Sequence, residues 1–388
     1  MKSSVPKIKY FCICFAGMTY SQNLFNSIKV LYFLSFVSNL ASINIYKLFF
    51  SLTVFLVEVP TGYFADVLGN KYSVILSRIT VIISMLFIIL DPSFINFIIA
   101  NILLGLSSSL DSGASNTLYM TTIGAEEWVE FLPEYLSLNK LMSAFLAILS
   151  SILYSINPIL PFAATIAIML ISLIAMVPLQ DNLRHKKLRS EHPKEKFVDK
   201  NKRLVQIILN SNILTLLFNI TLLTSLLIFN FEYYSVYYAA LNLNVEFLGL
   251  IYASFMVINL IGIQLFKRIK INLHILTGIV FISIILIQQS SISLFIVSVL
   301  IQQVFFAYIN TLATDSILRS INAIEDSSHF QSLLSMLVFG IRNFLLLVLI
   351  LLAYYFDLNI AFNLGMIIII VFIILFNRLI KHYQRLAH

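Results

Sequence analysis

Six ionisable side chains stand out inside long apolar stretches of this sequence. An ionised group is unfavourable in hydrocarbon, so such residues face a water-filled cavity or one another. Carboxylates in that setting can bind and release protons, and a carboxylate beside an ammonium can form a buried pair. The first candidates for a functional site are therefore Lys29, Glu58, Asp111, Lys140, Glu232 and Arg342.

Asp111 and Lys140 form one candidate pair. At a helical rise of about 1.5 Å per residue, Asp111 lies about 5 Å from the middle of its apolar stretch and Lys140 about 8 Å from the middle of the next, both toward the same side. The two side chains can therefore meet between neighbouring helices. A static ion pair and a site that binds a proton or a solute explain these residues about equally well.

Membrane-spanning helices must hold these candidates. Of 388 residues, 60% are hydrophobic and 11% are charged, and the mean hydropathy is +0.94. Soluble domains have roughly 45–50% apolar and about 25% charged residues, so a soluble enzyme is excluded. A bilayer core of about 30 Å needs about 20 helical residues. We expect an all-α polytopic membrane protein with twelve transmembrane helices, at residues 10–37, 43–66, 72–90, 94–122, 135–156, 160–178, 206–241, 246–266, 273–289, 292–318, 331–353 and 359–378.

Lysine and arginine residues predict the orientation of these helices. With the N-terminus inside, cytoplasmic segments hold 20 of the 25 basic residues, so we expect both termini to be cytoplasmic. Charged residues recur between the halves at a nearly constant offset, 203 for Lys29 and Glu232 and 202 for Lys140 and Arg342, as a parallel repeat requires. The sequence thus predicts two pseudo-symmetric six-helix bundles, at residues 1–179 and 206–388, joined by a cytoplasmic linker at 180–205.

A short motif ends the second predicted helix and leads into the third. Gly62 would permit close helix contact, and Asp66 can accept hydrogen bonds from the N-terminus of a neighbouring helix. Gly69 lets the chain reverse within about four residues, and Lys71 keeps the loop on the cytoplasmic side. These residues form a predicted conformational motif.

At this motif the chain resembles the major facilitator superfamily, whose loop between the second and third helices carries G-x-x-x-D-R-x-G-R-[RK]. Val67 and Asn70 stand in place of the two arginines. The segment 112–119 in the fourth predicted helix also resembles efflux-type members. The resemblance implies alternating access, with the first and seventh helices lining a central cavity. Four positions match the pattern: Gly62, Asp66, Gly69 and Lys71.

In that fold, Lys29 and Glu232 form a second candidate pair, because each lies about 9 Å from the middle of its helix toward the outside. A bridge between them would be a gate that breaks when the outside opens, and the alternative is that each reaches the outer surface alone. Tyr233 and Tyr237 flank Glu232. They indicate either an interfacial aromatic belt or a pocket for an amphiphilic or cationic solute.

The resemblance implies a secondary active transporter. Asp111 and Glu232 can exchange protons for solute, so we expect proton-coupled export of a small amphiphilic organic solute, such as a drug, a metallophore or a secreted metabolite. Import of a nutrient by proton symport or facilitated diffusion is the alternative, and a non-transporting membrane sensor is a third hypothesis.

Motifs for catalysis and for phosphate or metal binding are missing, including GxxxxGK[ST], HExxH, CxxC and GxSxG. We therefore expect no enzyme activity, no cofactor and no metal site. The expected partners are a small-molecule solute, protons as the coupling ion and the lipid bilayer of the cell membrane, without nucleic acid. We expect a monomer.

Overall fold

The computed structural model describes residues 7–17, 23–37, 41–179, 212–240, 244–289, 291–321 and 327–387. For some helical residues, Asp66 and Glu232 among them, it describes the backbone without the side chain. The described residues are almost all α-helical and none lies in a β-strand, which confirms the all-α prediction. Among them are eight helical segments that are long and apolar enough to cross a membrane and two shorter apolar helices.

Backbone proximity divides the chain into two compact units. One contains Met1–His185 and Tyr238–Val257, and the other contains Lys186–Tyr237 and Ile258–His388. The predicted bundles with boundaries at residues 179 and 206 stay a prediction, and the linker between them lies outside the described residues.

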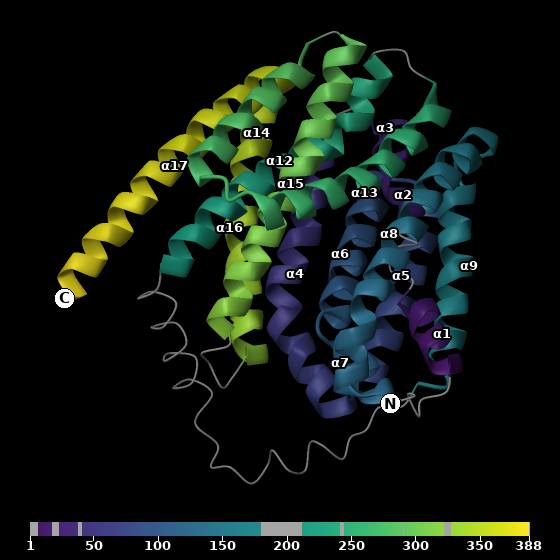
Figure 1. The fold of residues 1–388 in the computed structure, drawn as a ribbon. Helices are drawn as coiled ribbons and strands as arrows, with labels where there is room; N and C mark the ends of the chain where they lie inside the picture. The colour runs from purple at the N-terminus through teal and green to yellow at the C-terminus, as the bar shows by residue number, and fades with distance from the viewer. Residues whose placement is uncertain are drawn as a thin grey trace. The chain divides into compact units, whose positions relative to one another are not determined.

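The described helices overlap with the predicted ones. Every one of the twelve predicted spans contains helical structure, because apolar runs long enough for the bilayer satisfy their backbone groups internally. Before the linker the helices are α1 (Lys7–Ala16), α2 (Asn23–Asn26), α3 (Lys29–Leu34), α4 (Ala41–Leu68), α5 (Asn70–Leu90), α6 (Phe94–Asp111), α7 (Ala114–Ile123), α8 (Ala125–Ile156) and α9 (Leu160–Ala175) (Figure 1). After it they are α12 (Asn212–Ala240), α13 (Val245–Arg268), α14 (Leu273–Ile287), α15 (Ile292–Ile321), α16 (Ser327–Tyr355) and α17 (Leu358–Ala387).

Two predicted spans are broken. The described residues of the first form three helices, α1, α2 and α3, with a turn at residues 27–28 between the last two. The fourth is interrupted between α6 and α7 at Ser112 and Gly113, where Gly113 has a φ of 74°. A positive φ is strained for residues with a Cβ, so glycine allows this break within the membrane segment. The break places Asp111 at the end of a helix rather than in its middle.

Buried serines join α5 to α6, which run side by side in Figure 1. The hydroxyls of Ser73 and Ser84 donate to carbonyl oxygens of α6 at 2.6 and 2.9 Å, and Ser77 shares a hydrogen bond with Ser107 at 2.9 Å. Small residues let helix backbones approach closely where lipid supplies no hydrophobic driving force. This contact fixes the positions of the charged side chains on both helices.

Candidate functional site

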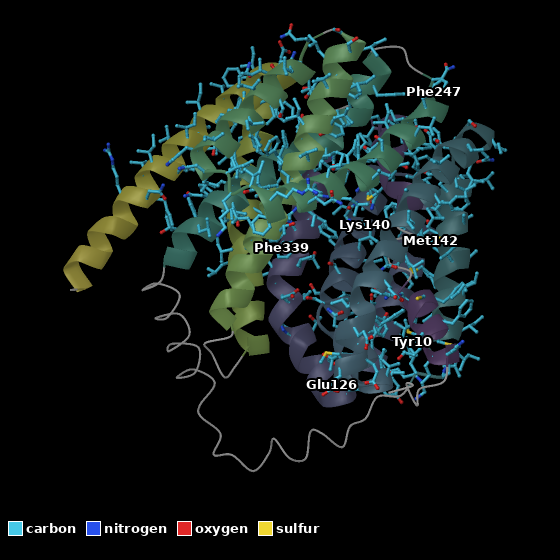
Figure 2. The ribbon with its side chains drawn as sticks, in the orientation of Figure 1. Tyr10, Glu126, Lys140, Met142, Phe247 and Phe339 are labelled. Carbon is cyan, nitrogen blue, oxygen red and sulfur yellow. The ribbon has the colours of Figure 1, made fainter. Side chains whose placement is uncertain are left out.

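Asp111, the last residue of α6, forms an ion pair with Arg78 of α5. Arg78 Nη2 lies 2.9 Å from Asp111 Oδ1, and the two side chains are 1% and 23% exposed. Lys140, labelled in Figure 2 on α8, has an exposed side chain, as do its neighbours Leu141 and Met142. The partner of Asp111 is therefore Arg78 and not the predicted Lys140, because α8 turns Lys140 to an exposed face.

Further hydrogen bonds hold this ion pair. Arg78 Nη1 donates to Ser77 Oγ at 3.1 Å, and Nη2 donates to the carbonyl oxygen of Ala16 at 3.3 Å. Ser115 Oγ donates to Asp111 Oδ1 at 2.5 Å. The guanidinium is thus paired with a carboxylate and tied to both α1 and its own helix, while Nε alone has no hydrogen-bond partner. An arrangement of this kind neutralises two charges inside the membrane segment.

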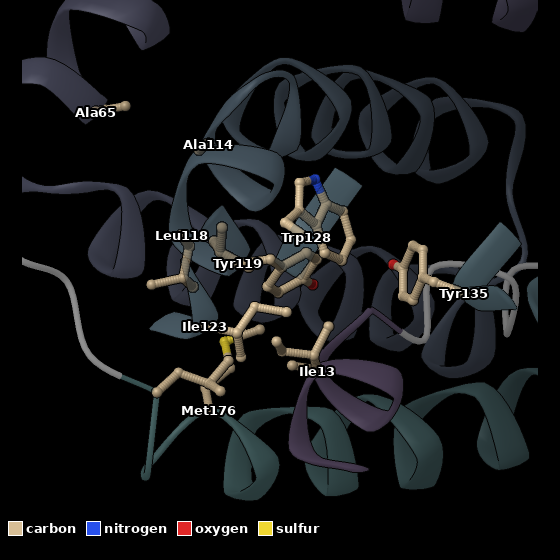
Figure 3. Packing of buried hydrophobic residues seen from close by; sticks show 12 residues of the cluster. Ile13, Ala65, Ala114, Leu118, Tyr119, Ile123, Trp128, Tyr135 and Met176 are labelled. Carbon is tan, nitrogen blue, oxygen red and sulfur yellow. The ribbon is translucent and has the colours of Figure 1, made fainter. Parts of the chain in front are cut away.

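Aromatic side chains surround the arginine. Tyr119 and Tyr135 lie close enough to Arg78 to interact with it electrostatically. The ring centroid of Trp128 lies 5.3 Å from the ring centroid of Tyr119 and 5.3 Å from that of Tyr135. Figure 3 shows the three residues together. A Cβ on Gly17 would lie 2.0 Å from the Tyr135 hydroxyl, so only glycine fits at this point. The ion pair therefore belongs to a tightly packed part of the first unit.

Glu58, on α4, has a different environment beside the break between α6 and α7. Its side chain is 7% exposed, and Oε1 accepts a hydrogen bond from Ser112 Oγ at 2.9 Å. No cation of the described residues lies within ion-pair distance of its carboxyl group. A proton bound to Glu58 would therefore remove a buried charge without leaving an orphaned cation, whereas a proton bound to Asp111 would leave Arg78 unpaired.

The outer candidate pair is described only in part. Lys29 begins α3 and is 7% exposed, and its Nζ lies 5.5 Å from the centroid of the Tyr46 ring. The Glu232 side chain lies outside the described residues, so the predicted gate between Lys29 and Glu232 stays a prediction.

The two predicted pocket tyrosines both meet α17. The Tyr233 ring is fully buried, with the ring centroids of Phe229 and Phe362 at 5.1 and 5.8 Å. The Tyr237 hydroxyl donates to Asn359 Oδ1 at 3.3 Å. These contacts join α12 to α17, and a role of the tyrosines in a solute pocket stays a prediction.

Arg342, on α16, has no carboxylate of the described residues beside it. Its Cζ lies 5.0 Å from the centroid of the Phe339 ring, which Figure 2 labels, and its Nε is buried without a hydrogen-bond partner. Arg342, one of the six predicted candidates, is thus a cation inside a membrane span, and an aromatic face lies next to it.

Arg78 is the charged residue of this cluster that the sequence interpretation did not select. It lies inside the predicted span 72–90 and is charged, so the rule that selected the other six residues also applies to it. Its position about three residues from the middle of that span was the available signal.

Comparison with known proteins then identifies the family. A family model described as Major Facilitator Superfamily matches residues 11–324. The chain belongs to this superfamily. Over 159 residues it is 31% identical to an uncharacterized MFS-type transporter, YxaM, of Bacillus subtilis (strain 168), and the match spans 40% of this chain and 39% of that relative.

Solved structures of the superfamily share the fold. The nucleoside transporter NupG has a TM-score of 0.66 at 12% identity, covering 97% of this chain and 98% of that one. A POT family transporter bound to a thioalcohol-conjugated peptide has a TM-score of 0.68 at 13% identity, covering 95% and 94%. The D-xylose-proton symporter has a TM-score of 0.64 at 12% identity, covering 94% and 96%. At these identities the likeness establishes the fold alone, and the superfamily consists of transporters rather than enzymes.

The superfamily motif after α4 takes a specific form here. Gly69 is the single residue between α4 and α5 and has a φ of 112°, so the predicted reversal at a glycine is confirmed. Lys71 Nζ donates to the carbonyl oxygens of Val177 and Leu179 at 2.9 Å each, at the end of α9. No described atom of another segment lies within 4 Å of a Cβ built on Gly62, so the expected close helix contact is not found there.

Asp66 completes that motif, and its side chain lies outside the described residues. Its predicted role, accepting hydrogen bonds from the N-terminus of a neighbouring helix, stays a prediction. Asn70, which stands where the superfamily pattern has an arginine, begins α5 two helical turns before Arg78.

Proposed function

We propose that this superfamily member exports a small amphiphilic organic solute by alternating access, driven by inward proton flow, and that Glu58 binds the proton. The observation that supports this assignment is the environment of Glu58, a carboxyl group 7% exposed whose hydrogen bond comes from a hydroxyl at 2.9 Å rather than from a cation. Asp111 is less suited to the role because its charge is matched by Arg78. The coupling role expected for Asp111 therefore passes to Glu58.

The break in the fourth span supplies a way to change the proton affinity of Glu58. Ser112 lies in that break and its hydroxyl stabilises the ionised form of the Glu58 carboxyl group. Movement at Gly113 would withdraw the hydroxyl, and a carboxylate left in a dry environment without this donor binds a proton more tightly. Alternation between the two arrangements lets Glu58 take up a proton on one side and release it on the other.

Secretion by living cells tests this function for all cellular solutes at once. Metabolites inside and outside cells are compared with and without expression of the chain, at an acidic external pH and after addition of a protonophore. We expect a set of solutes whose secretion rises with expression and returns to background when the protonophore collapses the gradient. Solutes that instead accumulate inside the cells would favour the import alternative. Secretion that does not change when the protonophore is added would favour uncoupled transport.

Glu58→Gln isolates the proposed proton site. The amide of glutamine keeps an oxygen that can accept from Ser112, so the protein should reach the membrane at the wild-type level. We expect gradient-driven secretion to fall about tenfold or more, since the coupling between two ligands is typically worth a factor of about 5–150. Glu130→Gln, at an exposed position of α8, is the matched control and should secrete normally.

We further propose that the protein is a monomer of the cell membrane with both termini cytoplasmic. A cysteine introduced at Ser190, in the predicted linker, should react with a membrane-impermeant thiol reagent only after the cells are opened. Reaction in intact cells would reverse the proposed orientation.

A further inference from the structure

Arg342 faces the protein rather than lipid. On a helix, residues three, four and seven positions apart share a face, and those positions after Arg342 are Leu345, Leu346 and Leu349. All three are at most 2% exposed. Exposed residues of α16 lie away from this face, among them Leu337, Phe344, Leu347 and Leu351. The guanidinium therefore does not point into the lipid.

The depth of Arg342 also separates it from the membrane surface. The apolar span of α16 is Met336–Tyr355, 20 residues long. At about 1.5 Å per residue, Arg342 lies about 5 Å from the middle of this span. The edge of the hydrocarbon, about 15 Å from the centre, is beyond the comfortable reach of its side chain. A cation at this depth needs an anion or water inside the protein.

The surroundings of Arg342 contain a ring and unmet hydrogen-bonding groups. Arg342 Cζ lies 5.0 Å from the centroid of the Phe339 ring, a cation–π arrangement that supplies no counter-charge. Arg342 Nε and both amide atoms of the adjacent Asn343 are buried without a hydrogen-bond partner. Buried polar atoms in native proteins are nearly always paired, so the unpaired Nε of Arg342 indicates that this cation lacks a partner.

We propose that this missing partner is an oxyanion of the transported solute, which Arg342 binds through paired N–H groups of its guanidinium. Arginine matches the geometry of a carboxylate or phosphate and forms two parallel hydrogen bonds with it. The solute is therefore an organic anion rather than a cation, and this inference rests on the proposed function as a solute exporter.

Two dyes with the same xanthene ring system and opposite charge test the charge preference: fluorescein, an anion in mildly alkaline buffer, and rhodamine 123, a cation. Each dye is titrated with the purified full-length protein in detergent, and binding is followed by fluorescence anisotropy. We expect saturable binding of fluorescein, with rhodamine 123 bound much more weakly. A wild-type protein that does not bind fluorescein saturably, or that binds both dyes alike, would overturn the proposal.

Variants of the arginine locate the binding. Arg342→Gln should weaken fluorescein binding about 10- to 100-fold, the factor expected from losing charge-assisted hydrogen bonds, while Arg342→Lys should retain part of the affinity. Arg268→Gln, at an exposed position at the end of α13, is the matched loss of one positive charge and should bind as the wild type does. Size-exclusion profiles show that each variant is folded. Equal affinity in folded Arg342→Gln would overturn the proposal.

A lipid phosphate is the other source of the same chemistry. Phosphatidylglycerol is added to the fluorescein complex, and we expect it to leave the dye bound because the headgroup stays at the membrane surface. Displacement of the dye by phosphatidylglycerol in the wild type would assign the site to lipid and overturn a solute site. The titration uses no proton gradient and is therefore independent of the transport assay. If fluorescein does not bind but proton-driven secretion is observed, the anion site is wrong and the proposed function is not affected.

Discussion

Two arginines lie inside membrane spans of this transporter, and their surroundings differ. Arg78 is paired with Asp111 at 2.9 Å and tied to α1 by a further hydrogen bond. Arg342 has a phenyl ring at 5.0 Å and no carboxylate of the described residues beside it. Removing one member of a buried pair leaves an uncompensated charge, whereas removing an unpaired charge leaves none. The first arginine therefore stabilises the fold, and the second is available for a ligand.

The two acids of the first unit differ in the same way. Asp111 forms an ion pair with Arg78, whereas Glu58 accepts a hydrogen bond from a serine hydroxyl. A charged residue inside a membrane span is therefore not by itself evidence of a functional site. The two kinds of charged residue differ in their partners. A structural one has an oppositely charged side chain beside it, and one that binds a proton or a solute has none.

The largest expected effect is on Arg78. Arg78→Gln should lower the free energy of unfolding by about 3–5 kcal/mol, because Asp111 is left as a partly buried carboxylate without its cation. Trp128, the single tryptophan, lies next to the tyrosines that surround Arg78, so its fluorescence follows unfolding of this region.

The double variant Arg78→Gln with Asp111→Asn provides the control for that prediction. It removes both charges together and should recover much of the lost stability, since the damage is the isolated charge rather than the absent pair. A double variant no more stable than Arg78→Gln would show that the pair does not hold the fold through charge.

A smaller loss of stability is expected at Gly17, which packs against Tyr135 near the Arg78–Asp111 ion pair. In Gly17→Ala the new methyl group would overlap the Tyr135 hydroxyl, and the resulting shift should destabilise the protein by about 1–3 kcal/mol. Gly278→Ala on α14 is the matched control, because no described atom of another segment lies within 4 Å of a Cβ there. That control should be stabilised by about 0.5–1 kcal/mol, as expected for alanine within a helix. Thermal unfolding of both variants measures the contrast.

The smallest effect concerns Lys71, a cation that donates to backbone carbonyl oxygens beyond the end of α9. Lys71→Met removes the two hydrogen bonds to the carbonyl oxygens of Val177 and Leu179 at the end of α9. A cation at a helix C-terminus contributes about 0.3–1 kcal/mol, so the unfolding midpoint should fall slightly. Lys270→Met, at an exposed position, should leave the midpoint unchanged. A loss as large as that of Arg78→Gln would mean that charged residues at the surface and in the interior are equally structural.

The sequence predicts the spans of this fold well because bilayer thickness sets the length of an apolar run. The breaks in the first and fourth spans were not predicted. Apolar content is the same in a continuous and a broken helix, and the break at Ser112 and Gly113 depends on a backbone conformation that glycine permits without requiring.

The partner of Asp111 illustrates why site geometry is harder to predict than the spans. Arg78 lies about 5 Å and Lys140 about 8 Å from the middle of their predicted spans, both toward the predicted cytoplasmic side, so depth allows either side chain to reach Asp111. The choice is made by the rotation of each helix about its axis, which turns Arg78 inward and Lys140 to an exposed face. That rotation depends on packing against neighbouring helices, such as the serine contacts between α5 and α6.

The unfolding free energies of Arg78→Gln and Arg342→Gln, measured side by side, show whether the two arginines differ in their contribution to stability. Both variants replace an arginine inside a membrane span by the same neutral residue. We predict that Arg78→Gln is destabilised by about 3–5 kcal/mol and that Arg342→Gln is as stable as the wild type or more so, since no counter-charge is left behind. Equal destabilisation of the two variants would contradict the distinction between a structural and a ligand-binding charge.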